Sequence, residues 1–488
     1  MRDYSFGNFI STLRQRKGLS QYQLGVFVGV SDKAVSKWEN GASKPRTNII
    51  RKLSEVLDVS VDELLTCEYV TLNTKRKDLF AMKKEIIKQA EQRLRELYGE
   101  LVPISIMNRF NMEKLMLENN DAVLWMGFLG DLQELFSKED IYFELRSPQT
   151  EASFMAWLLG CTIVNPLPAH YYCPKCKKVE FVQGELCGLD LPDKKCSCGS
   201  QFSKDGFTID VMNMYPVSNR HELHVPNKGI ELAKKYLNEY FEGYGSIREI
   251  VIGDENGDAD SSDYSVNRYV LVSAEQAKAY PNEKTIVDGE TYMNIMREMP
   301  GVTLVEYRGK QTGSIYGKDL NISRKQIEAF YECAVKSGYF QSPYRDICLD
   351  GALKYISKPK FSDIIALCGC LHGTGVWEDN AEVLLEDGIP LDKIISCRED
   401  VYHYLYKMMN GKCCDNPSGQ VYEIKEAVRK GRYSNGRMPA NVENLLLECD
   451  VPKWYVESMK KIKYLFPKTH LITSVKRDIV NYIENTAQ

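Results

Sequence analysis

The chain has 488 residues, more than one compact core usually holds, so several domains are expected. With 43% hydrophobic and 27% charged residues, it has the composition of an ordinary soluble globular protein. Neither a membrane span nor an apolar signal region is apparent, which excludes those two classes and predicts a cytoplasmic protein without a membrane partner. The fifteen cysteines follow no disulfide framework, as expected in a reducing compartment.

Charge is spread unevenly along the chain. The formal net charge is −4, yet residues 1–66 hold ten basic and seven acidic side chains. The other residues hold 53 basic and 60 acidic side chains. Any contact with nucleic acid is therefore expected to be local.

Residues 1–66 predict an all-α bundle of five short helices. Gly18 closes the first helix, Ser20 and Ser31 cap the second and third, Pro45 precedes the fourth, and Ser60 caps the last. One small core is expected from the apolar positions Ile10, Leu13, Leu24, Val28, Val30, Val35, Trp38, Ile50, Leu53, Leu57, Val61 and Leu64.

The turn at 28–31 contains Gly29, where the chain reverses between two helices and a positive φ is expected. This pattern is a helix-turn-helix. The run LSQYQLGVFVGVSDKAVSKWENGASKP, with LSEVLDVSVDELL after it, resembles the Xre (Cro/C1-type) family of DNA-binding domains. The resemblance implies that the third helix enters the major groove of double-stranded DNA.

The same resemblance implies which side chains face the DNA. The third helix would present four of them to bases or phosphates, the start of the second helix would clamp a phosphate, and the loop after the third helix would meet the backbone. The predicted DNA contacts are Gln21, Asp32, Lys33, Ser36, Lys37, Lys44 and Arg46. Asp32 could read cytosine or could serve only as a helix cap. The alternative for the whole module is a helical bundle used for protein contacts.

A helical connector is predicted over residues 67–96. Apolar residues recur at nearly heptad spacing at Phe80, Ile87, Ala90, Leu94 and Leu97. This spacing would suit a coiled-coil homodimer, which would let two modules read two half-sites. The alternative is an amphipathic helix that packs on its own domain.

Two closely spaced cysteine pairs lie within residues 165–206. Cys173 and Cys176 form the first pair, and Cys196 and Cys198 form the second. Four thiolates in two short turns can close a tetrahedral zinc site. The second pair is one residue tighter than usual, so Cys187 is an alternative ligand. The other interpretation is a set of free buried cysteines.

The runs NPLPAHYYCPKC, LPDKKCSCG and KDG of this stretch resemble the zinc-bearing part of the palm in PolC, a DNA polymerase III alpha subunit. The resemblance implies structural zinc, a PolC-like palm remnant over residues 97–310 and a mainly helical fingers region over residues 311–488. The expected fold is thus an α+β multidomain protein with an N-terminal all-α helix-turn-helix bundle. Strands are expected at 249–252 and 269–272, joined by a solvated acidic loop at 254–263.

Two parts of the PolC pattern are missing. The glycine-rich segment that holds the triphosphate is replaced by ELRSPQTEASFMA, where Glu144 and Glu151 would repel phosphates. The two metal-binding aspartates of the family fall at HELHVP, where Glu222 is the single candidate remnant of a catalytic carboxylate. The family's third aspartate has no counterpart. Catalysis is expected to be lost, and Mg²⁺ would be needed only if activity survives.

Resemblance returns in FSDIIALCGCLHGTGVW, at residues 361–377, and continues toward the end of the chain. In the family these fingers carry cations toward the nucleotide and the template. The matching positions are Arg398, Arg429, Lys430, Lys463, Lys468 and His470. The alternative is that these motifs only build the helical fingers.

The sequence therefore predicts a sequence-specific DNA-binding protein, either a transcriptional regulator or a replication-linked accessory factor, with an inactive PolC-like body. Its expected partner is double-stranded DNA, with primer-template, nucleotide, a replisome protein or a second copy as further candidates. The alternative functions are an active DNA-directed DNA polymerase of the PolC type and an oligomerisation scaffold.

Overall fold

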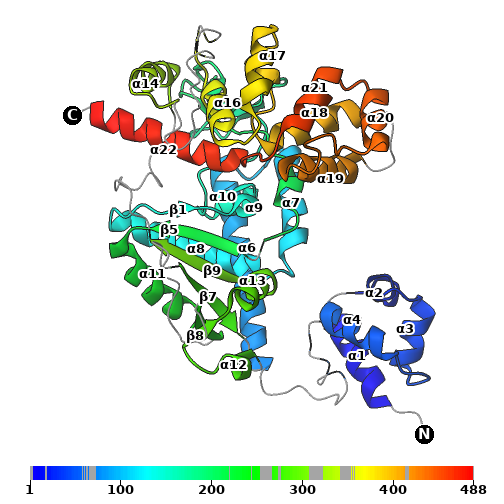
Figure 1. Cartoon of the computed structure of the whole chain (residues 1–488). Helices are drawn as coiled ribbons and strands as arrows, with labels where there is room; N and C mark the ends of the chain where they lie inside the picture. Colours follow the sequence, from blue (N-terminus) through cyan, green and yellow to red (C-terminus); the bar gives the residue numbers. More distant parts are fainter. Residues whose placement is uncertain are drawn as a thin grey trace. The chain divides into compact units, whose positions relative to one another are not determined.

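The computed structural model of the chain is drawn in Figure 1. It describes residues 4–16, 19–57, 59, 61, 64, 73–218, 220–242, 244–252, 266–272, 276–306, 322–340, 353, 356, 358–412 and 417–486. The chain divides into two compact units, Met1–Phe80 and Ala81–Gln488. Each unit is described by itself below.

Unit 1 contains helices α1 (Tyr4–Arg16), α2 (Gln21–Val28), α3 (Asp32–Glu39) and α4 (Thr47–Leu57). The predicted caps of α2 and α3 are confirmed. Ser20 and Gln23 form a reciprocal capping box, and the Ser31 hydroxyl accepts a hydrogen bond from the backbone N–H of Ala34. Gly29 has a φ of 79°, as expected for the turn between α2 and α3. The predicted cap of a fifth helix at Ser60 lies outside the described residues.

The predicted core of unit 1 is confirmed. Nine of its positions are buried, Val30 and Ile50 pack against them, and Val61 is half-buried. Phe6 and Phe9 join this core although the sequence pattern did not single them out. The nine buried positions are Ile10, Leu13, Leu24, Val28, Val35, Trp38, Leu53, Leu57 and Leu64.

Helix α6 (Asn73–Tyr98) crosses the boundary between the units. Its apolar stripe is buried at Ile87, Ala90 and Leu94, while Phe80 is 42% exposed. The stripe ends at Tyr98, whose ring packs against His170 and Phe154 of unit 2. The coiled-coil interpretation of this stripe is therefore wrong, and the alternative of a helix packed on its own domain is confirmed.

Unit 2 is built on a six-stranded mixed sheet in the order β1-β5-β9-β7-β6-β8. The pairs β5–β9 and β6–β8 are parallel and the others are antiparallel. The two predicted strands lie in β6 and β7, and the acidic loop predicted at 254–263 lies outside the described residues. The strands are β1 (Glu144–Leu145), β5 (Arg220–Val225), β6 (Ser246–Ile252), β7 (Val266–Val272), β8 (Lys284–Val287) and β9 (Gly301–Glu306).

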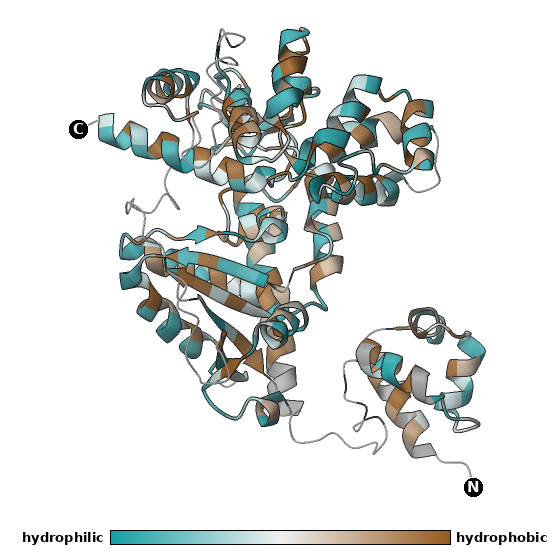
Figure 2. Cartoon of the chain, viewed as in Figure 1, coloured by the Kyte–Doolittle hydropathy of each residue, from teal (hydrophilic) through white to brown (hydrophobic). Residues whose placement is uncertain are grey.

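Helices cover both faces of this sheet (Figure 1). Helix α11 (Asn227–Tyr240) packs on one face together with α8 (Ala122–Lys138). Helix α13 (Gly289–Glu298) covers β6 and β7 on the other face, where Ile250, Val270 and Tyr292 are buried together. Figure 2 contrasts the largely hydrophilic strand β5 with the hydrophobic strand β9 beside it. Strand β5 thus places polar side chains between the short edge strand β1 and strand β9.

A second, three-stranded antiparallel sheet has the order β3-β2-β4, with β2 (His170–Tyr172), β3 (Val179–Phe181) and β4 (Ser203–Asp205). The remaining described elements of unit 2 are mostly helical, as predicted for the C-terminal region. None of the helices in the described ranges is long and apolar enough to cross a membrane. The helices are α7 (Ile104–Leu117), α9 (Pro148–Glu151), α10 (Phe154–Leu158), α12 (Gln276–Ala279), α14 (Arg324–Lys336), α16 (Phe361–His372), α17 (Glu382–Glu386), α18 (Arg398–Met409), α19 (Pro417–Arg429), α20 (Ala440–Glu448), α21 (Lys453–Lys461) and α22 (Lys468–Thr486).

Candidate nucleic-acid interface and metal centre

Helix α3 presents a polar outer face in unit 1. Its inner face buries Val35 and Trp38, which fixes the rotation of the helix on the core. Six predicted DNA contacts fall on the opposite face or in the loop that follows. Asp32, Lys33, Lys37, Lys44 and Arg46 are exposed, and Ser36 is half-exposed. The structure therefore leaves this set accessible, and their contact with DNA stays a prediction.

Asp32 has a local partner at the start of α3. Its Oδ1 atom accepts a hydrogen bond of 2.8 Å from the backbone N–H of Lys33. A carboxylate in the first turn also interacts favourably with the helix dipole. The cap of α3 is Ser31, so Asp32 is the first residue of the helix, and its contact with a base stays a prediction.

Gln21 is tied to a buried ion pair that the sequence pattern did not reveal. Arg14 of α1 donates to both carboxylate oxygens of Glu39, at 2.5 and 2.9 Å. The amide of Gln21 donates to the same carboxylate at 2.8 Å. Burial alone would raise the pKa of Glu39, but the hydrogen bonds from Arg14 and Gln21 outweigh it and lower the pKa. The three side chains therefore fasten α1 and α2 to the end of α3, and a phosphate contact by Gln21 stays a prediction.

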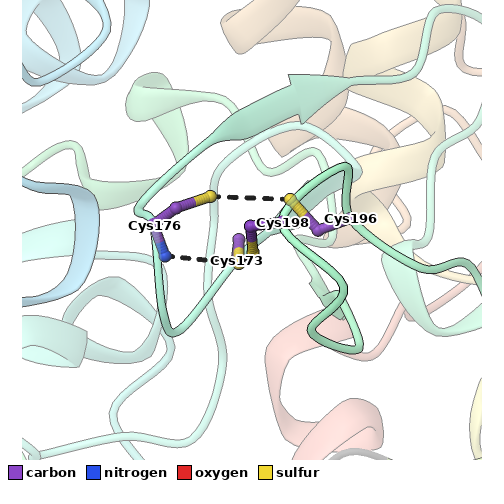
Figure 3. Close-up of side chains that lie close together, drawn as sticks. All are labelled: Cys173, Cys176, Cys196 and Cys198. Carbon is purple, nitrogen blue, oxygen red and sulfur yellow. Dashed lines mark hydrogen bonds between the residues drawn. The ribbon is translucent and has the colours of Figure 1, made fainter.

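The two cysteine pairs converge in unit 2 (Figure 3). Cys173 and Cys198 have their sulfur atoms 3.5 Å apart, as do Cys176 and Cys196. All four sulfur atoms lie within 4.8 Å of one another. Tetrahedral zinc with Zn–S bonds of about 2.3 Å separates its sulfur ligands by roughly 3.8 Å. The arrangement can therefore hold a metal ion such as zinc.

Cys187 is not part of this cluster. Its side chain is buried elsewhere, and burial raises the pKa of its thiol well above the usual value. The alternative of Cys187 as a ligand is therefore wrong, and the tighter second pair supplies two sulfurs.

Glu222 lies on the sheet face that α13 partly covers, in one row with Thr303 of β9 and Arg268 of β7. The carboxylate accepts a hydrogen bond of 2.6 Å from His224 of the same strand. Burial would raise the pKa of Glu222, but His224 outweighs it and lowers the pKa. Glu222 is therefore ionised at neutral pH and already engaged by an imidazole.

Arg268 is fully buried in this row. Its guanidinium donates to the Thr303 hydroxyl at 3.2 Å and to the backbone carbonyl of Met299 at 2.9 Å. Burial lowers the pKa of Arg268 to about 10, so the side chain still carries its charge at neutral pH. Thr303 of β9 lies between Glu222 of β5 and Arg268 of β7. The sheet thus holds the Arg268 cation in the same cross-strand row as the Glu222 carboxylate.

The two acidic residues of ELRSPQTEASFMA face the interior of unit 2. Glu144 lies 3.1 Å from the Arg146 side chain and 3.3 Å from that of Arg477 in α22. Glu151 is 1% exposed and accepts a hydrogen bond of 3.3 Å from the Thr473 hydroxyl. Burial raises the pKa of Glu151 to about 8, so this carboxyl is mostly protonated at neutral pH.

The predicted nucleotide- and template-facing cations separate into two groups. Three of them lie beside acidic residues inside unit 2, although burial lowers the pKa of His470 to about 4 and leaves it uncharged at neutral pH. Arg398 is 6% exposed and bonds Glu399 at 2.8 Å, Lys468 lies 3.3 Å from Asp400, and His470 lies 3.5 Å from Glu144. Their role in facing a nucleotide stays a prediction.

The other three cations lie at the surface. Lys430 and Lys463 are exposed, and Arg429 is half-exposed with its guanidinium on Glu426 at 2.6 Å. The backbone at Gly431 lies close against the backbone at Lys463. A Cβ atom on Gly431 would be 2.4 Å from the Lys463 carbonyl oxygen, so only glycine fits there. Lys430 also lies 3.4 Å from Glu426, so two of these three cations share one carboxylate at the end of α19.

Comparison with known proteins gives two matches. Residues 10–64 match the family described as Helix-turn-helix. The chain is also 27% identical over 476 residues to the "DNA polymerase III PolC-type" of Caldanaerobacter subterraneus subsp. tengcongensis, covering 80% of this chain and 32% of that protein. The Staphylococcus aureus protein of the same name is 27% identical over 456 residues, covering 79% of this chain and 31% of that protein.

The "DNA polymerase III PolC-type" of Streptococcus thermophilus is 25% identical over 536 residues, covering 90% of this chain and 36% of that protein. The chain spans about a third of the length of these curated relatives. It joins a helix-turn-helix domain at residues 10–64 to a body similar in sequence to PolC-type DNA polymerase III.

Proposed function

We propose that this chain is a sequence-specific DNA-binding protein, acting as a transcriptional regulator or a replication-linked accessory factor. In this proposal residues 1–66 read double-stranded DNA and residues 67–96 connect them to a palm remnant at 97–310 and fingers at 311–488. The observation that carries the proposal is the exposed polar face of α3 within a matched helix-turn-helix domain. A cytoplasmic location, where DNA is accessible, follows from this role.

The body, in this proposal, does not polymerise nucleotides. Two-metal phosphoryl transfer needs several carboxylates around two divalent cations about 4 Å apart. The row that contains Glu222 offers one carboxylate, already bonded to His224, and carries the buried Arg268 cation beside Thr303. A buried positive charge opposes the binding of Mg²⁺ nearby.

The second candidate function is an active DNA-directed DNA polymerase that uses Mg²⁺. The sequence similarity to PolC-type relatives extends over most of the body and favours this candidate. A polymerase body would also give the accessible Lys430 and Lys463 a template to bind.

We propose that the cysteine cluster binds one structural Zn²⁺ through Cys173, Cys176, Cys196 and Cys198. The separations among the sulfur atoms support this assignment. Four thiolates leave no open position on the ion, so it would hold the two turns together and take no part in chemistry.

Reversing two charges of α3 is expected to abolish specific DNA binding. Lys33→Glu with Lys37→Glu turns attraction toward phosphates into repulsion, so affinity should fall at least about 100-fold and the salt dependence should weaken. Fluorescence anisotropy with a duplex selected from a random library measures both. Lys453→Glu is the matched control, since Lys453 is exposed on α21. Unchanged affinity in the double variant would contradict the proposed interface.

Purified protein is expected to show no primer extension with Mg²⁺ or Mn²⁺ and all four nucleotides. The physical reason is that, among the described residues, this row offers one carboxylate and also carries the buried Arg268. Extension that Glu222→Ala abolishes would establish the polymerase candidate instead. Duplex binding without extension supports the first proposal and turns attention to what the body binds.

A further inference from the structure

Helix α7 has two apolar stripes on opposite sides. The inner stripe is buried and consists of Ile106, Phe110 and Leu117. Arg109 holds the helix in place by donating hydrogen bonds to the backbone carbonyls of Ile209 and Ala152, at 2.7 and 2.8 Å. One buried stripe is all that a helix needs to pack on its own domain. The outer stripe therefore requires a separate explanation.

The outer stripe is solvent-exposed along the length of α7. Ile104 and Leu115 are 78% and 71% exposed, and Leu101, just before the helix, is 95% exposed. These are the three highest values for large apolar side chains among the described residues. Met112 on the same side is 50% exposed. Figure 1 shows α7 at the outer side of unit 2. An exposed apolar patch of this kind marks an interaction surface.

The order of side chains in this stripe is symmetric about its centre, with Ile104 and Leu115 as similar but not identical apolar ends. Along the helix it runs Ile104, Met107, Asn108, Asn111, Met112 and Leu115. Positions separated by four, seven and eleven residues share one face of an α-helix, so these side chains form one continuous surface. Two copies of a palindromic surface complement each other when the helices run antiparallel.

We propose that two copies of this chain pair through antiparallel packing of their α7 helices. Ile104 of one copy then packs on Leu115 of the other, Met107 packs on Met112, and Asn108 faces Asn111. Paired asparagines can satisfy each other's amide groups and fix the register of two helices. The half-buried Glu118 lies next to the positive N-terminal end of the opposite helix.

This surface differs from the α6 stripe, which is buried within the chain. The inference also stands apart from DNA binding, because the pairing uses side chains of unit 2 alone. A single pair of helices of this length, about 21 Å, lies at the small end of interface sizes, so self-association in the micromolar range is expected.

Sedimentation velocity on the full chain without DNA tests the proposal, at about 1 to 100 µM protein. Wild-type protein should dimerise across this range. Ile104→Glu with Leu115→Glu places like charges opposite each other and should weaken the dimer at least about tenfold. Ile104→Glu with Leu115→Lys places opposite charges across the antiparallel pair and should keep the dimer within about threefold of wild type. Parallel pairing would give that rescue variant repulsion instead.

Val383→Glu with Leu447→Glu is the matched control. These exposed side chains lie on α17 and α20, 41% and 43% exposed, and their replacement should leave the dimer unchanged. All replaced side chains are exposed, so thermal unfolding should confirm that each variant is folded. A monomeric wild type, an equal loss of dimer in both charged α7 variants, or an equal loss in the control would overturn the proposal.

Discussion

Removal of the metal by a chelator is expected to unfold the small sheet β3-β2-β4. Its core contains Cys173 and Cys196 together with Tyr171, Leu191 and Phe202, so two of the proposed ligands are also core side chains. Each of its strands has only three residues, and a hydrophobic core of this size contributes little by itself. A structural zinc ion contributes on the order of 10 kcal/mol in small zinc peptides. The proposed ion would therefore account for most of the stability of this segment.

Unfolding of the small sheet should also destabilise the start of α16. Asp190, which follows the first cysteine pair, accepts hydrogen bonds from the backbone N–H groups of Phe361 and Ser362 at 2.7 and 3.4 Å. These are orphan donors in the first turn of a helix, and a carboxylate satisfies them well. When the segment loses its metal, hydrogen exchange should rise both at 170–205 and at the first turn of α16.

The ligands are tested one at a time by Cys176→Ser and Cys198→Ser. Each variant is expected to lose the one equivalent of zinc that wild-type protein should carry, measured by metal analysis after gel filtration. Cys333→Ser is the matched control, because Cys333 is exposed and lies outside the cluster. Cobalt substitution gives a second readout, since tetrahedral thiolate coordination produces a distinct absorption spectrum. Full zinc content in both ligand variants would contradict the proposed site.

Features that depend on neighbouring residues could be predicted from the sequence. Ser20 and Ser31 cap their helices, and Gly29 turns the chain, because each acts within three or four residues. Each cysteine pair could also be predicted, because a short turn brings its two cysteines together. The loop between the pairs left the choice of ligands open until the structure separated Cys187 from the others.

Features that depend on distant partners could not be predicted. Glu39 could not be paired with Arg14, 25 residues away, because either could equally lie in solvent. The row of Glu222, Thr303 and Arg268 depends on a register among three strands that are far apart in the chain. The outer stripe of α7 was missed because a helix that is apolar on both sides gives a weak amphipathic signal.

Replacement of Glu151 by glutamine is expected to stabilise unit 2 at neutral and basic pH. The carboxyl is 1% exposed, and burial raises its pKa from 4.5 to about 8. In the unfolded chain Glu151 ionises near its ordinary pKa, while in the folded chain it keeps its proton. The contribution of Glu151 to the free energy of unfolding is therefore fully present below its ordinary pKa. It is lost as pH rises toward the pKa that the carboxyl has in the folded chain.

Glutamine is neutral at every pH and keeps an oxygen for the Thr473 hydroxyl. The variant should match wild type near pH 4 and exceed its stability by about 3 kcal/mol at pH 7. Urea unfolding followed by tryptophan fluorescence at both pH values measures the difference. A variant that is less stable than wild type at pH 7 would show that the buried carboxyl is ionised and satisfied.

Glu144→Gln in the same segment should behave in the opposite way. Burial would raise the pKa of Glu144, but Arg146 and Arg477 outweigh it and lower the pKa. Its stabilising effect is therefore present above the ordinary pKa of 4.5 and is lost as pH falls through the folded value. Removing this charge leaves Arg477 without one carboxylate partner, at a cost of roughly 1 to 3 kcal/mol at pH 7. Opposite signs in the two variants would show that this segment is an interior element of unit 2, in which a neutral acid and an ion pair hold α22.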